Sequence, residues 1–300
     1  MRDSFFQLGN DCEAAYRNLR DLPSNNDRRE FVEALWARFR PSPDKHFLKE
    51  ARNNFLQRFW EMYLFAALDD QGLGPQKGGG TGPDLLVVVN GVRYWVEAMA
   101  PRRGEGADAV PEMDWGSHEV RQAPLDQIQL RYANAISEKA RKWSRWVRDG
   151  IVRTGDGFLI ALNGRGCNEF FDSNPPLFVR ACAAVGHLTI AIDPATLKVV
   201  DGFYTFSDSV TKMSGETVST APFFQDEFSH VSGVIHSLAC AWYRPDSLLE
   251  GMEFLHNPLA NVPIQGDALR GLRQFTISPQ GITTIQPEPA WPEDKVIVVE

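Results

Sequence analysis

Hydrophobic residues along the first 70 positions recur at helical spacing. The stretch EFVEALWARFR (30–40) is amphipathic and is followed by Pro41 and Pro43, which predicts a helix ending near residue 40. Residues 45–72, KHFLKEARNNFLQRFWEMYLFAALDDQG, predict one longer helix ended by Gly72. Because the second half of this stretch is apolar on nearly every side, we expect it to pack into a core.

Residues 84–100 predict a β-hairpin, because two apolar runs flank the dipeptide Asn90-Gly91. Asn-Gly is the strongest short-range signal for a two-residue type I′ turn. Counting outward from that turn, Val89 faces Val92, and Asp84 faces Glu97. Two carboxylates therefore lie directly opposite each other, with Cβ atoms roughly 4.5–5.5 Å apart.

The rest of the chain alternates between helical and strand patterns. A long helix is predicted from about Pro124 to Asp149, with Gly150 just past its end. Beyond it we expect a short helix at 178–186 and strands at 158–164, 187–193, 198–206, 230–239, 252–257 and 274–285. This order indicates an α/β fold with a mixed β-sheet flanked by helices on both faces.

Composition is that of a soluble globular protein, with 43% hydrophobic and 23% charged residues. No apolar run is long enough to span a membrane, and the N-terminus lacks the apolar centre of a signal peptide. The four cysteines are far apart and form no CxxC pair, so we expect a reducing, cytoplasmic environment.

The net charge of −8 is unevenly distributed along the chain. Residues 120–153 hold eight Lys or Arg against three Asp or Glu, whereas residues 201–300 hold five against thirteen. A locally basic middle region suits phosphate contacts. A solvated helix face explains the same pattern equally well.

The facing carboxylates Asp84 and Glu97 are the first candidate site. Like charges in that position are destabilising unless something neutralises them, and LLVVV after Asp84 reads as a buried strand. A divalent cation, Mg²⁺ or Mn²⁺, would neutralise both. The alternative is that both acids lie at a solvated rim of the hairpin. Met99 shares the face of Glu97, at the place where a lysine would point toward the same metal and phosphate.

These residues resemble the PD-(D/E)xK nuclease superfamily, the restriction-endonuclease-like fold. Pro83-Asp84 matches the PD half, and Glu97-Ala98-Met99 matches (D/E)xK with Met in place of Lys. The resemblance covers roughly residues 46–165. It implies a restriction-endonuclease-like α/β core at 46–206, preceded by an N-terminal helical region at 1–45 and followed by a β-rich extension at 207–300 packed on the core.

The resemblance also implies a further metal-binding Glu on the helix before the hairpin, where Glu61 lies in RFWEMYLFAAL. A carboxylate among Trp60, Met62 and Leu64 is costly unless it is paired, hydrogen-bonded or metal-bound. A structural ion pair with an arginine is the competing interpretation.

Lys139 is the candidate for the missing lysine. On a helical wheel of residues 125–147, it falls in the middle of an apolar stripe that contains Ile128, Ile136 and Trp143. A lysine centred on a core-facing stripe requires a buried anion, which the carboxylates would supply. Snorkelling of the ammonium to a rim is the alternative.

Four further residues are candidates for nucleic-acid contacts: Arg102, Arg103, Gln127 and Arg131. The two arginines at 102–103 follow the second hairpin strand, in a loop where solvated charges are equally common. Gln127 and Arg131 lie one turn apart on the edge of the long helix, facing either phosphate or water.

Three functions remain open at this point. The first is a metal-dependent nuclease that acts on nucleic acid, with DNA favoured. The second is a catalytically inactive member of the same fold that binds nucleic acid or protein. The third is an unrelated α/β protein whose acids are structural. In the first, Asp84, Glu97 and Lys139 would be catalytic, with Glu61, Asp84 and Glu97 as metal ligands. A homodimer is compatible with each.

Overall fold

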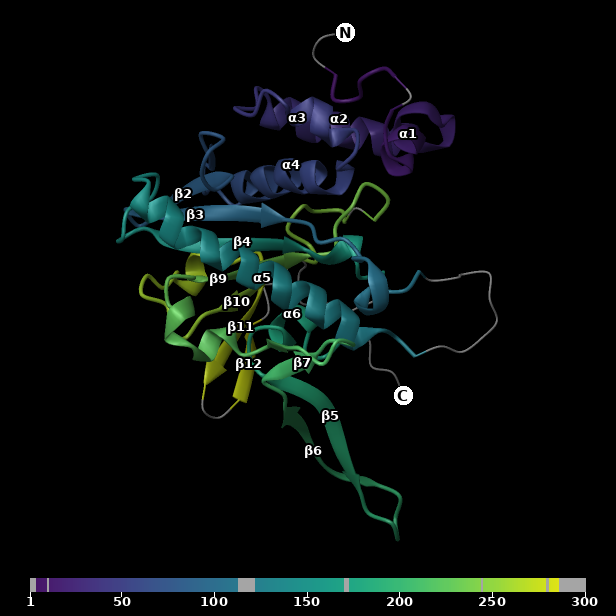
Figure 1. Cartoon of the computed structure of the whole chain (residues 1–300), viewed down its shortest axis with the longest axis vertical. Helices are drawn as coiled ribbons and strands as arrows, with labels where there is room; N and C mark the ends of the chain where they lie inside the picture. The colour runs from purple at the N-terminus through teal and green to yellow at the C-terminus, as the bar shows by residue number, and fades with distance from the viewer. Residues whose placement is uncertain are drawn as a thin grey trace, which may run out of the picture.

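The computed structural model describes residues 4–9, 11–112, 122–169, 173–243, 245–278 and 281–285. Within them the chain forms a mixed α/β structure built around one large sheet, with helices on both of its faces (Figure 1). No helix among the described residues is long and apolar enough to cross a membrane.

The large sheet has eight strands in the order β1-β2-β3-β4-β9-β10-β11-β12. Strands β3, β4 and β9 are parallel, β10 and β11 are parallel to each other, and the remaining neighbours are antiparallel. The strands span Gln76–Lys77 (β1), Leu85–Val89 (β2), Val92–Met99 (β3), Gly157–Asn163 (β4), Gly233–Ser237 (β9), Glu253–His256 (β10), Arg273–Ser278 (β11) and Gly281–Ile285 (β12).

The β2–β3 hairpin has the predicted register. Val89 pairs with Val92, and Leu85 pairs with Val96. Both turn residues take positive φ angles, 50° at Asn90 and 80° at Gly91, as a type I′ turn requires. Local turn chemistry therefore sets which residues face each other across the hairpin.

Each face of the sheet is covered by its own hydrophobic cluster. Helices α1 (Ala14–Asp21), α2 (Asn26–Phe39), α3 (Phe47–Ala51) and α4 (Phe55–Asp70) cover one face together with the inward residues of β2 and β3. Helices α5 (Leu125–Arg148) and α6 (Leu177–Arg180) cover the other, where Trp95 and Met99 of β3 also pack. Side chains alternate along β3, so Glu97, between Trp95 and Met99, lies on the α5 face.

The predicted helix over 45–72 is interrupted, which corrects the sequence analysis. It forms α3 and α4, separated at residues 52–54. A carboxylate oxygen of Glu13 accepts a hydrogen bond of 2.7 Å from the backbone N–H of Phe55, the first residue of α4. The backbone N–H of Glu13 in turn donates to the carbonyl of Arg52 at 2.8 Å. Glu13, which is distant in the chain, thus supplies a hydrogen-bond acceptor for the first N–H of α4. Helical periodicity cannot reveal such a partner.

The second half of the chain differs from prediction in three places. Helix α6 ends at Arg180 instead of residue 186, because the backbone N–H of Ala184 bonds to Thr220 and the chain enters β5 (Val185–Ile192). The strand predicted over 274–285 is a hairpin of β11 and β12. The region 207–300 contributes β9 to β12 to the same sheet as β2–β4, with its residues 244, 279–280 and 286–300 outside the described part.

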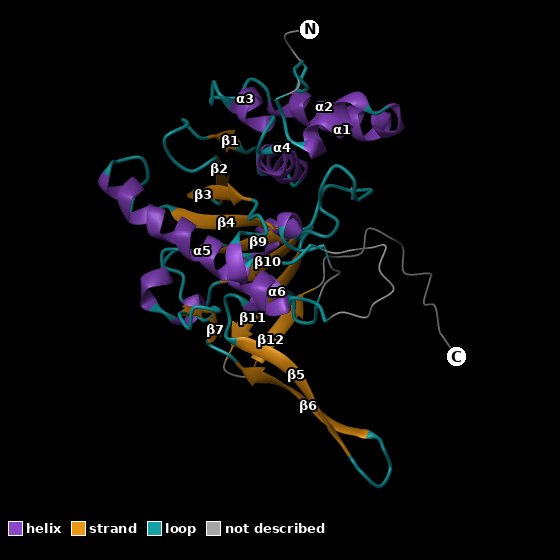
Figure 2. Ribbon diagram, turned by 45° about the vertical axis from the view of Figure 1, so that its right-hand side comes forward, coloured by secondary structure: helices purple, strands orange, loops and turns teal. Residues whose placement is uncertain are grey.

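Two small antiparallel pairs lie outside the large sheet. Strand β5 pairs with β6 (Val199–Phe206), and β7 (Ser209–Thr211) pairs with β8 (Thr217–Ser219). Both views show the β5–β6 hairpin extending away from the rest of the molecule (Figure 2).

Candidate functional site

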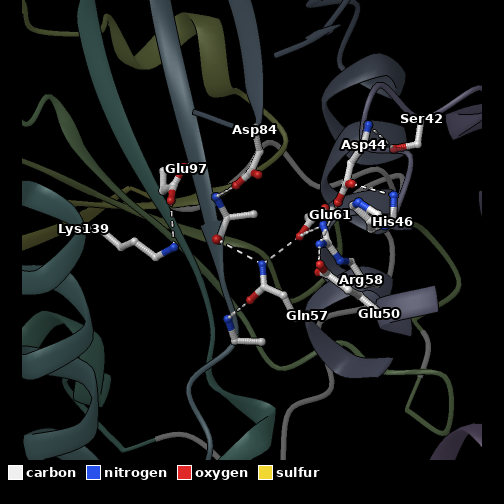
Figure 3. Close-up of polar contacts among 12 residues, drawn as sticks. Ser42, Asp44, His46, Glu50, Gln57, Arg58, Glu61, Asp84, Glu97 and Lys139 are labelled. Carbon is white, nitrogen blue, oxygen red and sulfur yellow. Dashed lines mark hydrogen bonds and ion pairs between the residues drawn. The ribbon is translucent and has the colours of Figure 1, made fainter. Parts of the chain in front are cut away.

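Asp84 occupies the position immediately before β2, where the hairpin register places it across from Glu97. Its Oδ2 accepts a hydrogen bond of 2.7 Å from the backbone N–H of Ala98 (Figure 3). Its backbone carbonyl accepts another from Gly78 at 2.7 Å. The carboxyl group of Asp84 is therefore held at the end of the β2–β3 ladder, beside the backbone of β3.

Lys139 reaches the hairpin from α5. Its Nζ lies 2.7 Å from Oε1 of Glu97, and both side chains are largely buried, with 17% and 7% exposed. Burial alone would lower the pKa of Lys139, but the facing Glu97 outweighs it and raises that pKa above its ordinary value. The helical wheel therefore identified the lysine that approaches the carboxylates.

Lys142 is a second cation at this position, which the sequence analysis did not select. Its Nζ lies 3.5 Å from the same Oε1 of Glu97, and its side chain is 39% exposed. It lies one helical turn after Lys139, so the i,i+3 spacing of two lysines was an available signal. Glu97 thus faces two ammonium groups on one helix.

Met99 fills a different role from the lysine of the motif. It is 5% exposed and packs in the hydrophobic cluster between β3 and α5. No cation from β3 itself therefore enters the site at that position. The cations that face Glu97 come from the neighbouring helix.

Glu61 forms the structural ion pair that the sequence analysis kept as an alternative. Its two carboxylate oxygens lie 2.8 and 3.1 Å from Nη1 of Arg58, one turn earlier on α4. Arg58 also contacts Asp44, at 2.9 Å, and Glu50. Burial raises the pKa of Glu61, and Arg58 opposes this effect. The carboxylate of Glu61 is therefore neutralised from its own helix.

Gln57 connects Glu61 to the hairpin backbone. Its Nε2 donates to Oε1 of Glu61 at 3.0 Å and to the carbonyl of Ala98 at 3.2 Å, while its Oε1 accepts from the N–H of Ala100 at 2.8 Å (Figure 3). One amide side chain thus uses both of its ends to fix α4 against β3. The backbone of Ala98 is therefore held by two side chains: its N–H donates to Asp84, and its carbonyl accepts from Gln57.

Burial and neighbouring acids both act on the carboxyl group of Asp84. Burial raises its pKa well above the ordinary value, and the nearby negative charges of Glu61 and Glu97 raise it further. The Ala98 N–H and Lys139 oppose these effects only in part. A hollow of about 180 Å³ lies beside Asp84 and Glu61. Its wall includes Arg58, Lys77, Gly78, Gly80 and Gly82. The carboxyl group of Asp84 therefore borders a space that a small ligand can enter.

Potential metal-ligating side chains do not form a cluster in the described part of the chain. No three side chains of His, Cys, Asp or Glu are grouped there closely enough to hold a metal ion. The set expected from the resemblance, Glu61 with Asp84 and Glu97, is not assembled as three free ligands, because Arg58 and Gln57 hold Glu61. Asp84 and Glu97 remain as the facing pair.

The predicted nucleic-acid residues make contacts within the protein. Arg102 donates to the carbonyl of Asn53 at 2.6 Å, and Arg103 to that of Pro111 at 2.5 Å and to Glu169. Arg131 donates to the carbonyl of Arg102 at 2.9 Å. Gln127 is partly exposed near the start of α5. Arg102, Arg103 and Arg131 thus hold the segment after β3 through contacts within the protein.

Comparisons with known proteins add no further identification. No family model, curated protein or solved structure matches this chain. The functional argument therefore rests on the chemistry of the site.

Proposed function

We propose that this protein is a metal-dependent nuclease that hydrolyses phosphodiester bonds of DNA. The observation that carries the proposal is the contact between Lys139 and Glu97, directly across the hairpin from Asp84. An acid pair with a lysine is the set of groups that the PD-(D/E)xK pattern uses. In this proposal the hairpin, α5 and β4 form a restriction-endonuclease-like core whose lysine comes from the helix.

Asp84 and Glu97 are the residues that fit a divalent cation. Asp84 leaves Oδ1 unused by the hydrogen bond to Ala98. Its pKa is raised by burial first and then by the charges of Glu61 and Glu97, and a bound cation would oppose both effects. Mg²⁺ binds through one or two carboxylates and otherwise keeps water and substrate phosphate as ligands. When bound, such a cation supplies an activated water and stabilises charge on the phosphate.

Lys139 has two roles in this proposal, one before and one after substrate binds. Before substrate binds, its ammonium holds the Glu97 carboxylate in place through the 2.7 Å contact. With substrate present, the same ammonium would orient the water or donate to a phosphoryl oxygen as negative charge develops there. Because the pKa of Lys139 is raised, it stays protonated at neutral pH and acts as a donor, not as a base.

Helix α5 supports nucleic acid as the substrate. It carries six Lys or Arg against two Asp or Glu. Arg145 and Arg148, near its end, are each 74% exposed and pair with Asp149 at 3.4 and 3.3 Å. Lys142 joins this exposed surface to the buried Glu97. A basic face that leads to the acid pair would place a phosphodiester backbone beside it.

A second candidate function is a nuclease-fold protein without catalysis. The observation that favours it is the double neutralisation of Glu97 by Lys139 and Lys142, which satisfies this acid without a metal. Such a protein would bind nucleic acid or a protein partner through the same basic helix.

The deciding experiment is a cleavage assay with Mn²⁺ on supercoiled, linear and single-stranded DNA. We compare the wild type with Asp84→Ala and Lys139→Ala, and use Arg270→Ala, which removes an exposed arginine outside α5, as the matched control. Cleavage lost in the first two variants and kept in the control supports the nuclease. DNA binding without cleavage by the wild type favours the inactive fold, and cleavage equal in all variants refutes the site.

A further inference from the structure

The β5–β6 hairpin is an arm that leaves the body of the protein. Its base is fixed by backbone hydrogen bonds, from Ala184 to Thr220 at 2.8 Å and from Ser207 to Ala184 at 2.9 Å. Beyond this base the two strands pair only with each other, and Figures 1 and 2 both show them projecting away from the sheet. With eight residues in β5, the arm is roughly 26 Å long.

One face of this arm is apolar and uncovered. Leu188 pairs with Tyr204, and Ile190 and Ile192 follow Leu188 on the same face. A register shift between Ala191 and Ile192 brings Val199 opposite Ile192, so Val199 joins this face. The five are 38–62% exposed. The opposite face carries Thr189 and Asp201, with Phe203 as its large apolar residue. The alternation is that of a strand pair with one buried side, although nothing in the described part of the chain covers that side.

The exposed apolar face of this two-stranded arm indicates that a binding partner covers it. An isolated two-stranded hairpin is marginal in water, and three or more strands or a packing partner are needed for stability. Contiguous apolar patches of this kind mark interaction sites. Since the arm is fixed only at its base, the partner would also stabilise the arm.

The charges of the arm identify the class of partner. Residues 185–206 contain one lysine, no arginine and two aspartates. Phosphates of nucleic acid and anionic lipid headgroups both require clustered Lys or Arg. An uncharged apolar face is instead self-complementary, and a second copy of the same face can cover it in a two-fold symmetric contact.

The ends of the arm favour the second copy as well. When two identical hairpins pack face to face in opposite directions, the tip of each falls near the base of the other. The tip presents Leu197, which is 80% exposed. The base has an open hollow of about 720 Å³ lined in part by Phe206, Ala221 and Phe224, and the two phenylalanines are 76% and 49% exposed. The other residues that line the hollow are polar: Asp208, Ser209, Thr217, Ser219 and Gln225. The apolar tip is separated from this hollow by about the length of one arm.

We propose that the β5–β6 hairpin is a dimerisation arm, which packs antiparallel against the arm of a second copy and inserts Leu197 into the hollow at the partner's base. Each copy then contributes its apolar arm face and the hollow at its base to the contact. This proposal does not depend on the nuclease activity.

The first test is sedimentation velocity of the full chain at 1–100 µM (about the range in which such contacts assemble). The wild type should sediment as a dimer of the 33.7 kDa chain. Ile190→Lys, on the apolar face, should weaken dimerisation at least tenfold, whereas Thr189→Lys, its neighbour on the opposite face, should not. Circular dichroism checks that both variants fold. A monomeric wild type, or a dimer that survives Ile190→Lys, overturns the proposal.

The second test is a cross-link between tip and base. In Leu197→Cys/Phe224→Cys the two thiols of one chain are separated by much of the arm, whereas a disulfide needs Cα atoms within about 7 Å. Oxidation should therefore give a covalent dimer in the double variant, with the wild type and each single variant as controls. Absence of a covalent dimer from the double variant, or binding of a monomeric chain to neutral lipid vesicles through Leu197, contradicts the arm-to-arm contact.

Discussion

The ammonium group of Lys139 lies 2.7 Å from Oε1 of Glu97, although 42 positions separate the two residues in the chain. The contact joins the middle of a long helix to the second strand of a hairpin. On that strand, two positions beyond Glu97, the side chain is Met99, which is buried in the core. The lysine that contacts the Glu97 carboxylate therefore comes from α5 and not from β3. Substitutions at positions 139 and 99 can test whether the lysine works from either element.

Removing the ammonium of Lys139 should abolish most of the DNA cleavage proposed for this site. We expect Lys139→Met to lower the cleavage rate about 10²–10³-fold, the typical cost of losing one donor to developing transition-state charge. Lys142→Met is the matched control, because it removes the more distant and more exposed ammonium, and it should cost less than tenfold. Single-turnover rates with Mn²⁺ measure both. Equal losses in the two variants would contradict a special role for Lys139.

Moving the lysine back to the strand should restore part of the activity. Met99 lies on the same face of β3 as Glu97 and packs against α5, so Met99→Lys in the Lys139→Met background places a new ammonium beside the same carboxylate. We expect at least a tenfold recovery over Lys139→Met alone. If the double variant folds, as circular dichroism would show, and recovers nothing, the equivalence of the two positions is refuted.

Binding of Mn²⁺ should stabilise the protein through Asp84. A ligand at 100 times its Kd adds about 2.7 kcal/mol to the free energy of unfolding. We expect a rise in the thermal midpoint of the wild type with Mn²⁺, and little or none for Asp84→Asn, which keeps an oxygen for the Ala98 N–H but loses the charge. Differential scanning calorimetry with and without EDTA measures the shift. The same shift in both proteins would exclude Asp84 as a ligand.

Stability without metal should depend on pH through Asp84. Its pKa is raised in the folded state, chiefly by burial and then by Glu61 and Glu97. The folded protein therefore holds this proton more tightly than the unfolded chain does, and the contribution is complete below the ordinary pKa of an aspartic acid. It is lost as the pH rises toward and through the raised pKa.

Asp84→Asn removes this dependence. In EDTA, the variant should be more stable than the wild type at neutral pH, and the difference should shrink as the pH falls toward 4 (about the ordinary Asp pKa). Urea unfolding at several pH values measures it. A difference that stays constant with pH, or grows toward acid, would show that Asp84 does not titrate as described.

Local signals in the sequence were enough to predict the hairpin and the long helix. Asn90-Gly91 fixed a register that the structure reproduces, and the apolar stripe of residues 125–148 oriented Lys139 toward the sheet. Both inferences depend on residues close together in the chain. The contact of Lys139 with Glu97 followed because each of the two elements had a definite inward face.

Features that depend on distant partners could not be predicted in this way. Arg58 neutralises Glu61, but the same arginine also contacts Asp44 and Glu50, and no periodic pattern selects among these acids. The joining of β9 to β4 places residues 233–237 in the central sheet through pairing across some 70 positions. Apolar strands near the C-terminus could pair in several orders, and the sequence does not choose between them.

The interruption between α3 and α4 gives the last prediction. The first N–H groups of a helix have no partner within it, and for α4 the Glu13 carboxylate supplies one at 2.7 Å from the N–H of Phe55. We expect Glu13→Ala to lower the free energy of unfolding by about 1 kcal/mol, the usual cost of losing a helix cap. Glu13→Gln keeps an oxygen acceptor and loses the charge near the helix N-terminus together with the 3.3 Å ion pair to the exposed Arg102, so it should cost a few tenths of a kcal/mol. Urea unfolding at neutral pH measures both changes, and a Gln variant as unstable as the Ala variant would show that charge, not the hydrogen bond, begins α4.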